Sequence, residues 1–150
     1  MYNLYCTFKG HSSYITAIDW SLDDGMIRSC CGAYELLFWS LASKKQDTSG
    51  ASNSTGTYWA NTSVKFGWRV TGIFPTGTDG THVNTVEESK DNRLIATGDD
   101  FGLVNVYRNP CRENHKARSY RGHSEHVTNL KFHGFGEHLI STGGQDKTVI

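Results

Sequence analysis

Hydrophobic and polar residues alternate along the chain in short runs, and turns separate these runs. Residues 15–21 alternate with a period of two, which is typical of a half-buried β-strand. Residues 22–25, Leu-Asp-Asp-Gly, form the next predicted turn, and strands are predicted after it at 26–31 and 35–39. Three strands joined by tight turns predict an antiparallel meander.

The same rhythm returns in the second half of the chain, after an irregular segment. Residues 47–56 are small and polar and predict an exposed, mobile loop. Further strands are predicted at 5–8, 83–86, 94–98, 103–107, 127–132, 138–144 and 146–150. No useful length of the sequence has helical periodicity, so the pattern predicts an all-β fold.

A repeated motif accounts for this rhythm. Gly-His-Ser at residues 10–12 returns at 122–124, and the alternating runs behind the two copies align as well. A weaker copy lies at 83–86. The distance from Val83 to Val127 matches the length of a WD-repeat propeller blade, about 40–45 residues. We therefore expect a partial WD-repeat β-propeller, with a little over two four-stranded antiparallel blades of a larger propeller.

The expected blades divide the chain into four segments. These are a blade at 1–46, with the outer strand of the preceding blade at 4–9, a polar loop at 47–58, an atypical blade at 59–110 and a truncated blade at 111–150. A closed propeller needs at least about four blades. We therefore expect the chain to be a fragment of a larger protein or a truncated gene product.

Polar residues recur at matching positions of the blades. His123, Ser141 and Asp146 are the three residue types of a nucleophilic triad, but they fall on the Gly-His, strand and turn positions of a blade. His11 and Ser29 occupy the same positions in the first blade. A structural network that ties a strand to a turn would recur in this way, whereas a catalytic triad would not. No Gly-x-Ser-x-Gly elbow supports a hydrolase.

We therefore predict a structural network and no catalytic residues, and we expect the chain not to be an enzyme. The predicted network comprises His11, Ser29, Trp39, Asp100, His123, Ser141 and Asp146. Asp100 is included because it aligns with Asp146 as a turn residue, whereas Tyr34-Glu35 stands at this place in the first blade. A hydrolase that uses His123, Ser141 and Asp146 remains as the least favoured hypothesis.

Metal and cofactor sites are not predicted. The chain has seven histidines, but none forms a helical i, i+4 pair and no cysteine pair lies near them. The spacing of Asp79, Asp99 and Asp100 does not match a calcium loop. The four cysteines, at positions 6, 30, 31 and 111, are expected to be reduced thiols that serve as small core residues.

Charge and aromatic content narrow the possible partners. The chain has 15 basic and 15 acidic residues, so it offers no net field for nucleic acid or membranes. Lys116, Arg118 and Arg121 are predicted to form a charged strand edge that faces solvent. Most aromatic residues are expected in the core. Trp59 and Trp68, beside the irregular loop, are the candidates for a partner surface, with core packing as the alternative.

Several blocks of the sequence carry a more specific signal. They lie at 10–21, 34–39, 68–75, 77–102 and 122–146. The strongest contains Ala-Thr-Gly-Asp-Asp-Phe-Gly at 96–102, which a generic WD repeat lacks. In this order the blocks resemble the echinoderm microtubule-associated protein-like family, over nearly the whole chain except the loop at 47–56.

The resemblance implies a WD-repeat protein with tandem, partly atypical propellers that associates with microtubules, and this segment is similar to its C-terminal blades. It implies a non-enzymatic interaction module in the cytoplasm and cytoskeleton, with tubulin or microtubules as partner. Nucleic acid, membrane and small-molecule partners are not expected. The alternative is a generic WD-repeat scaffold for another assembly, such as a signalling or ubiquitin-ligase complex, because propellers host many functions.

Overall fold

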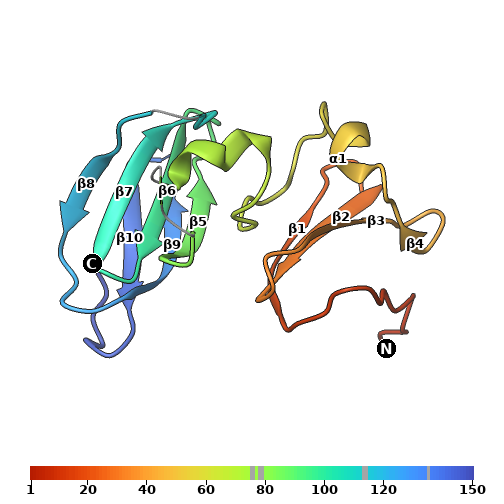
Figure 1. Ribbon diagram of the computed structural model, residues 1–150, viewed down its shortest axis with the longest axis horizontal. Coiled ribbons are helices and arrows are strands. Elements are labelled where there is room, and N and C mark those ends of the chain that lie inside the picture. Colours follow the sequence, from red (N-terminus) through yellow and green to blue (C-terminus); the bar gives the residue numbers. More distant parts are fainter. Residues whose placement is uncertain (75–76, 78–79, 113–114, 135) are drawn as a thin grey trace. The chain divides into compact units, whose positions relative to one another are not determined.

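A computed structural model describes residues 1–74, 77, 80–112, 115–134 and 136–150 of the chain. The chain divides into two compact units, Met1–Val64 and Lys65–Ile150. Figure 1 shows both units, coloured along the sequence. Asp79, one of the aspartates considered above for a cation site, lies outside the described residues.

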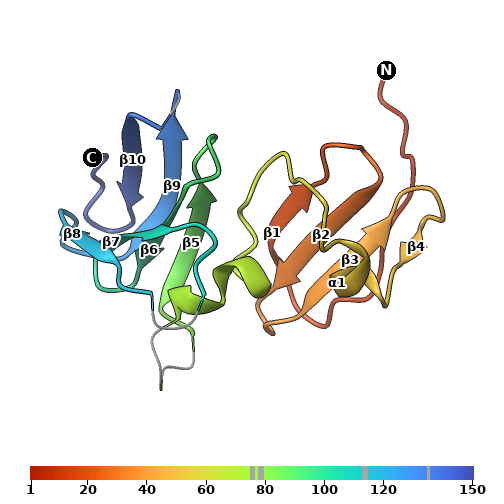
Figure 2. The same cartoon turned by 90° about the horizontal axis from the view of Figure 1, so that it is seen from above.

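The first unit is built on one four-stranded antiparallel sheet. Its strands are β1 (Ile15–Trp20), β2 (Met26–Cys31), β3 (Leu36–Ser40) and β4 (Lys45–Gln46), and they lie in the order β1-β2-β3-β4. Figure 2 shows this order in a second view. The first three strands confirm the predicted meander. The short β4 was not predicted, because its two residues are polar and show no alternation.

A buried carboxylate ties the end of this unit to its sheet. Asp19 on β1 is fully buried and forms an ion pair with Arg28 on β2, whose Nη2 lies 2.7 Å from Asp19 Oδ2. The same carboxylate accepts hydrogen bonds from the backbone N–H of Ser63 at 2.6 Å and of Val64 at 3.2 Å. Asn61 also donates to it, at 2.8 Å. Asp19 therefore connects segments that lie far apart in the sequence.

Two segments of this unit depart from the predicted pattern, while the place of residues 4–9 as the outer strand of a preceding blade stays a prediction. Residues 5–8 form no strand; Phe8 instead packs against Trp39 with ring centroids 5.2 Å apart. The expected loop at 47–56 contains one helical turn, α1 (Gly50–Asn53), held by two hydrogen bonds to the carboxylate of Asp47. Gly50 is buried, and a Cβ at this position would lie 2.2 Å from Phe38 Cβ. The hydrophobic pattern cannot reveal this contact, because glycine has no side chain.

The second unit contains two sheets. Strands β5 (Val83–Glu88), β6 (Leu94–Asp99), β7 (Leu103–Arg108) and β8 (Arg118–Arg121) form a four-stranded antiparallel sheet in this order. Strands β9 (Val127–His133) and β10 (His138–Gly143) form a second, two-stranded sheet. These strands confirm the predicted positions, and β8 is an exposed charged edge, as expected.

Two further segments of the second unit differ from the predicted pattern. A 3-10 helix, η1 (Trp68–Ile73), precedes β5, and it is too short to produce a helical period in the sequence. Residues 146–150 were predicted as a strand. Ser141 and Ile150 do exchange backbone hydrogen bonds, but pairing is limited to an isolated bridge, and Lys147 has a φ of 55° that interrupts the extended backbone.

The core of the second unit lies on both faces of the four-stranded sheet β5-β6-β7-β8, which is called the central sheet below. One cluster joins η1 to β5, β6 and β7 and consists of Val70, Ile73, Val83, Val86, Ile95, Tyr107 and Cys111. The other joins the sheet to β9 and consists of Ala96, Val104, Val127 and Leu130. A Cβ at Gly98 would lie 2.5 Å from Val127 Cγ1, so the two sheets approach closely there. Sheets packed face to face are typical of neighbouring propeller blades.

The helices of the described residues are short. None of them combines the length and the apolar character that a membrane-spanning helix requires.

Candidate functional site

A buried hydrogen-bond network surrounds His123. The Gly-His segment after β8 places the imidazole against β10, with Nε2 at 2.8 Å from Ser141 Oγ. Its Nδ1 lies 2.9 Å from Asp146 Oδ2 and 2.8 Å from Thr148 Oγ1. The His123 side chain is fully buried and that of Asp146 is 4% exposed. The structure therefore brings together all three residues that the sequence places at matching blade positions.

The electrostatics of this network hold Asp146 in its ionised form. Burial would raise the pKa of Asp146, but hydrogen bonds from the Thr148 N–H, from His123 and from the Thr148 hydroxyl outweigh it and leave this pKa below its usual value. Counted as whole residues, with the backbone included, His123 and Ser141 are 4% and 5% exposed. The base and the hydroxyl thus present almost no surface to a substrate, which favours the structural interpretation over the catalytic one.

A second network surrounds His11 in the first unit. His11 Nε2 lies 2.7 Å from Ser29 Oγ, and Trp39 Nε1 donates to the same oxygen at 2.7 Å. Because the indole N–H can only donate, every atom is satisfied when the Ser29 hydroxyl donates to Nε2. Nδ1 of His11 then carries the proton and donates to Glu35 Oε2, 3.2 Å away.

Glu35 is the member of this network that the sequence prediction missed. Its carboxylate accepts from the Ser12 N–H at 2.9 Å, the Ser12 hydroxyl at 2.9 Å and the Cys31 thiol at 3.2 Å. The Ser12 N–H, the Cys31 thiol, the Ser12 hydroxyl and His11 together lower the pKa of Glu35 to about 2. The sequence showed an acidic residue at this turn of the blade, but it did not show that the Glu35 carboxylate contacts His11.

The two networks differ in where the acid stands in the turn. In the first, Tyr34 has a φ of 63° and Glu35 follows it. In the second, Lys147 has a φ of 55°, Asp146 precedes it and Thr148 follows it. Counted from the left-handed residue, Glu35 therefore takes the place of Thr148 rather than that of Asp146.

The central sheet has a related but incomplete arrangement. Thr97 on β6 pairs with Asn105 and Ile95 pairs with Tyr107, a register that matches the one around Ser29 and Trp39. Thr97 and Tyr107 therefore hold the serine and tryptophan positions. The Thr97 hydroxyl is buried and makes no well-formed hydrogen bond in the described part of the chain, although its interaction with the Tyr107 hydroxyl lowers the pKa of that phenol against the larger, opposite effect of burial. Among the residues that the structure describes, none bonds to the Thr97 hydroxyl as the histidines bond to Ser29 and Ser141.

Asp100 has different surroundings from Asp146. It lies on an exposed turn and accepts from Asn84 Nδ2 at 2.9 Å, while His82 Nδ1 is 3.9 Å away. The neighbouring Asp99 is buried, and its Oδ1 accepts from the N–H groups of Phe101 and Leu103 at 2.9 Å each. Asp99 thus shapes the turn between β6 and β7, and the role assigned to Asp100 in the blade network remains a prediction.

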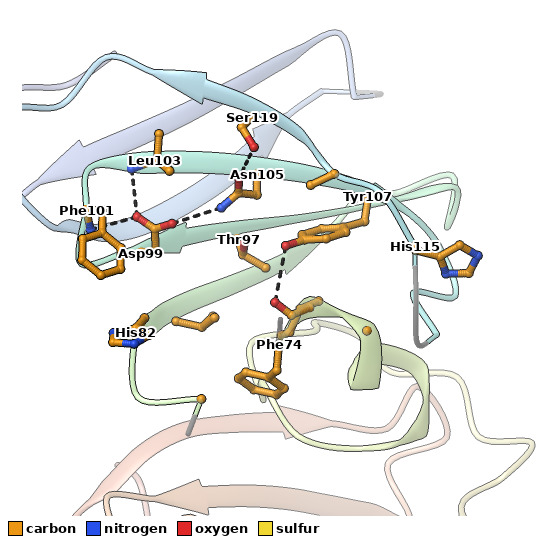
Figure 3. Close-up of a pocket in the computed structure, with 15 residues that line it drawn as sticks. Phe74, His82, Thr97, Asp99, Phe101, Leu103, Asn105, Tyr107, His115 and Ser119 are labelled. Carbon is orange, nitrogen blue, oxygen red and sulfur yellow. Dashed lines mark hydrogen bonds between the residues drawn. The ribbon is translucent and has the colours of Figure 1, made fainter. Parts of the chain in front are cut away.

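A pocket with a volume of about 590 Å³ lies over the face of the central sheet that carries Thr97 and Tyr107 (Figure 3). Asn105 donates to Asp99 Oδ2 at 3.1 Å and its Oδ1 accepts from the Ser119 hydroxyl at 2.6 Å. These polar groups satisfy one another, and the rest of the lining is largely apolar, with Phe74, Leu103 and Tyr107 among its members. The size suits a ligand site, but no acid–base pair in the described lining is aimed at a common point.

The two tryptophans considered as a partner surface lie in different units. Trp59 is half-buried, with the guanidinium of Arg28 4.3 Å from its ring centroid and Phe38 at 6.5 Å. Trp68 opens η1, is 48% exposed, and has the guanidinium of Arg112 5.7 Å from its ring. Trp68 is therefore the one that presents more of its ring to solvent.

The cysteines are free thiols. Cys30, Cys31 and Cys111 are buried and Cys6 is partly exposed. Burial raises the pKa of the Cys111 thiol to about 11, which makes it unreactive. Among the described residues, His11, Cys31 and Glu35 form a group whose ligand atoms could hold a metal ion.

The sheets and their networks define a class: blades of a WD-repeat β-propeller. Comparison with known proteins then gives the family. All 150 residues match the family model described as the echinoderm microtubule-associated protein second beta-propeller, and the chain belongs to this family. The resemblance read from the sequence blocks is thereby confirmed.

Two relatives illustrate the similarity. The chain is 51% identical over 149 residues to a ciliary WD repeat-containing protein, ctxp80, of Euplotoides octocarinatus. It is 46% identical over 145 residues to the 77 kDa echinoderm microtubule-associated protein of Strongylocentrotus purpuratus. These alignments cover 99% and 95% of this chain and 21% of each relative. The chain thus spans about a fifth of the length of these relatives.

A solved structure supports the fold alone. The computationally designed Ika4 protein aligns with a TM-score of 0.58 at 16% identity, and the alignment covers 100% of this chain and 97% of that protein.

Proposed function

We propose that this chain is a non-enzymatic protein-interaction module that contributes to binding of tubulin or microtubules, in the cytoplasm and at the cytoskeleton. One observation carries the proposal: the whole chain matches the second propeller of echinoderm microtubule-associated proteins. A relative that is 46% identical bears the name of a microtubule-associated protein. Proteins are the proposed partners, and nucleic acid, membranes and small-molecule substrates are not.

The geometry of the two networks supports this function. The side chains best suited to acid–base or nucleophilic chemistry lie around His11 and His123, where they are hydrogen-bonded to their own blades and largely buried. They stabilise the blades and leave turns and strand edges free for recognition, which is the usual division of labour in repeat proteins. Trp68 and the charged edge strand β8 are the proposed contact surfaces of the second unit.

We further propose that the segments 1–46, 59–110 and 111–150 belong to successive blades and that 47–58 connects the first two. The strand pairing crosses the boundary between the last two segments: β8 at Arg118–Arg121 lies within 111–150 but pairs with β7, so a strand just ahead of the next Gly-His motif completes the sheet of the preceding segment. The same relation is proposed for residues 4–9 and a preceding blade.

Co-sedimentation tests the function directly. The full-length protein that contains this chain, incubated with stabilised microtubules at low salt, is expected to pellet above a tubulin-free control. The double variant Arg118→Glu/Arg121→Glu is expected to pellet less, and Lys90→Glu, an exposed charge change outside β8, serves as the control. No pelleting above the tubulin-free level would contradict the proposal, and recovery of adaptor subunits without tubulin in a pull-down would favour the generic scaffold.

The absence of hydrolase activity has its own test. A fluorophosphonate probe is expected not to label the protein. Labelling that disappears in Ser141→Ala would show that this serine is a nucleophile and would overturn the structural interpretation.

A further inference from the structure

Three metal-ligating side chains meet where β2 ends. Nδ1 of His11, Sγ of Cys31 and a carboxylate oxygen of Glu35 all lie within 4.8 Å of one another. We propose that these three side chains bind a zinc ion, with the fourth position open to water. This site is independent of microtubule binding, because it needs only residues of the first unit.

The distances between the ligand atoms are close to those that zinc requires. Tetrahedral coordination with Zn–N of about 2.0–2.1 Å, Zn–O of about 2.0–2.2 Å and Zn–S of about 2.3 Å separates the ligand atoms by about 3.3–3.6 Å. His11 Nδ1 and Cys31 Sγ each lie 3.2 Å from Glu35 Oε2. These two distances need to lengthen by only a few tenths of an ångström, and the distance between Nδ1 and Sγ, which is at most 4.8 Å, needs to shorten by at most about 1.2 Å.

The chemistry of the donors selects the metal. One imidazole nitrogen, one thiolate and one carboxylate are ligands that zinc accepts together, whereas calcium and magnesium prefer oxygen ligands only. Three protein ligands leave one position for water or for a group from a partner. The Glu35 side chain is 34% exposed, so this position can be reached from solvent.

The protons of the cluster can be accounted for. Without metal, the His11 Nδ1–H and the Cys31 S–H both donate to Glu35. When zinc binds, the thiol proton leaves to solvent and His11 stays neutral, because its proton moves from Nδ1 to Nε2 and donates to Ser29 Oγ, while the Ser29 hydroxyl rotates its own proton away from Nε2. One proton is thus released for each zinc ion. The Ser12 hydroxyl remains bonded to Glu35 Oε1, at 2.9 Å, and orients the carboxylate.

The second network provides an internal control. Cys31 lies two residues after Ser29, and the residue two positions after Ser141 is Gly143. The His123 network therefore has a histidine and a carboxylate but no thiol. A single site for each chain is the expected stoichiometry.

Metal titration of the full chain tests the proposal. The reduced, chelator-treated protein is titrated with Zn²⁺ by calorimetry, and Co²⁺ is used as a coloured substitute. One zinc ion is expected to bind, with about one proton released in a weakly buffered solution. Co²⁺ is expected to give a near-ultraviolet thiolate band and visible bands typical of tetrahedral coordination.

Variants identify the ligands. Cys31→Ser and Glu35→Gln are expected to weaken zinc binding at least tenfold, and Cys31→Ser is expected to remove the thiolate band. Cys6→Ser, which removes a thiol outside the cluster, is expected to bind zinc like the wild type. Equal affinity in wild type and Cys31→Ser would overturn the proposal. If Cys31→Ser fails to fold, the wild type decides alone: no saturable binding, no thiolate band or no proton release contradicts the site.

Discussion

The His11 and His123 networks share a core and differ at the acid. In both, Nε2 of the histidine meets a strand serine, at 2.7 Å from Ser29 and 2.8 Å from Ser141. On the other side, His11 meets Glu35, which holds three further donated hydrogen bonds. His123 instead divides its Nδ1–H between Asp146 and Thr148. The fold thus requires an acceptor for Nδ1 at one point in space, and two different turns supply it.

The length of the acid compensates for its position in the turn. Asp146 precedes the left-handed residue of its turn and Glu35 follows that of its own. The extra methylene of glutamate allows a carboxylate at the second position to reach the histidine. The blade therefore constrains where the carboxylate lies, and it does not constrain which sequence position provides it.

The largest expected effect comes from removing the histidines. His123→Ala leaves the buried Ser141 hydroxyl without its partner and removes one donor from Asp146, which keeps Thr148, and it is expected to cost about 1–3 kcal/mol of unfolding free energy. His11→Ala is expected to cost less, because Ser29 keeps the hydrogen bond from Trp39 and Glu35 keeps its donors from Ser12 and Cys31. Denaturant unfolding of the complete propeller measures both. Equal losses, or no loss for His123→Ala, would show that the acids do not distinguish the networks.

Removal of the indole N–H in the first network should lower the unfolding free energy by less. Trp39→Phe keeps an aromatic ring on β3 but removes the N–H that donates to Ser29. We expect a loss of about 0.5–1.5 kcal/mol from the hydrogen bond, with a further loss from the cavity that the smaller ring leaves at this buried position. Trp68→Phe is the matched control, because Trp68 is exposed. A loss in the control as large as that of Trp39→Phe would mean that ring packing, rather than the donor, is being measured.

Acid titration distinguishes the networks by the pKa of Glu35. This pKa falls from an ordinary value of 4.5 to about 2 in the folded chain, so the unfolded chain binds more protons between these values. The stability that Glu35 contributes is complete above about pH 4.5 and is lost as the pH falls towards 2. Glu35→Gln is expected to flatten this part of the stability curve. Glu125→Gln, an exposed change outside both networks, should leave it steep.

The smallest effect is expected in the central sheet. Thr97→Val removes a buried hydroxyl that interacts with Tyr107 but makes no well-formed hydrogen bond among the described residues, so the unfolding free energy should change by less than about 0.5 kcal/mol. Ser29→Ala, at the same position of the first sheet, removes the acceptor of Trp39 and is expected to destabilise. A large loss in Thr97→Val would indicate that this hydroxyl has a partner in the complete protein.

The local part of the fold could be predicted from the sequence. Alternation marked β1, and short runs rich in apolar residues marked the other strands; β2 and β6 are buried almost continuously, and tight turns keep the strand pairing local. The packing of Gly50 on Phe38 and the contact of Phe8 with Trp39 could not be predicted. Both depend on contacts between distant positions, and neither changes the local pattern.

The candidate site was also predicted only in part. The repeat indicated His123, Ser141 and Asp146, because each lies at a fixed distance from a Gly-His motif. Glu35 was missed as the partner of His11, because a comparison by position cannot show that a longer side chain reaches the same point. Cys31 was predicted only as a core thiol. Its place beside His11 and Glu35 follows from the fold of the turn, which spacing in the sequence does not encode.

The buried carboxylate of Asp19 has a consequence for the topology of the chain. Through the N–H groups of Ser63 and Val64 it closes a long loop that includes residues 47–58. The entropy of closing a flexible loop grows only with the logarithm of its length, so doubling the length costs about 0.6 kcal/mol. Asp19 thus acts as a reversible cross-link between fixed ends. The connecting segment can lengthen between those ends while the sheet keeps its register.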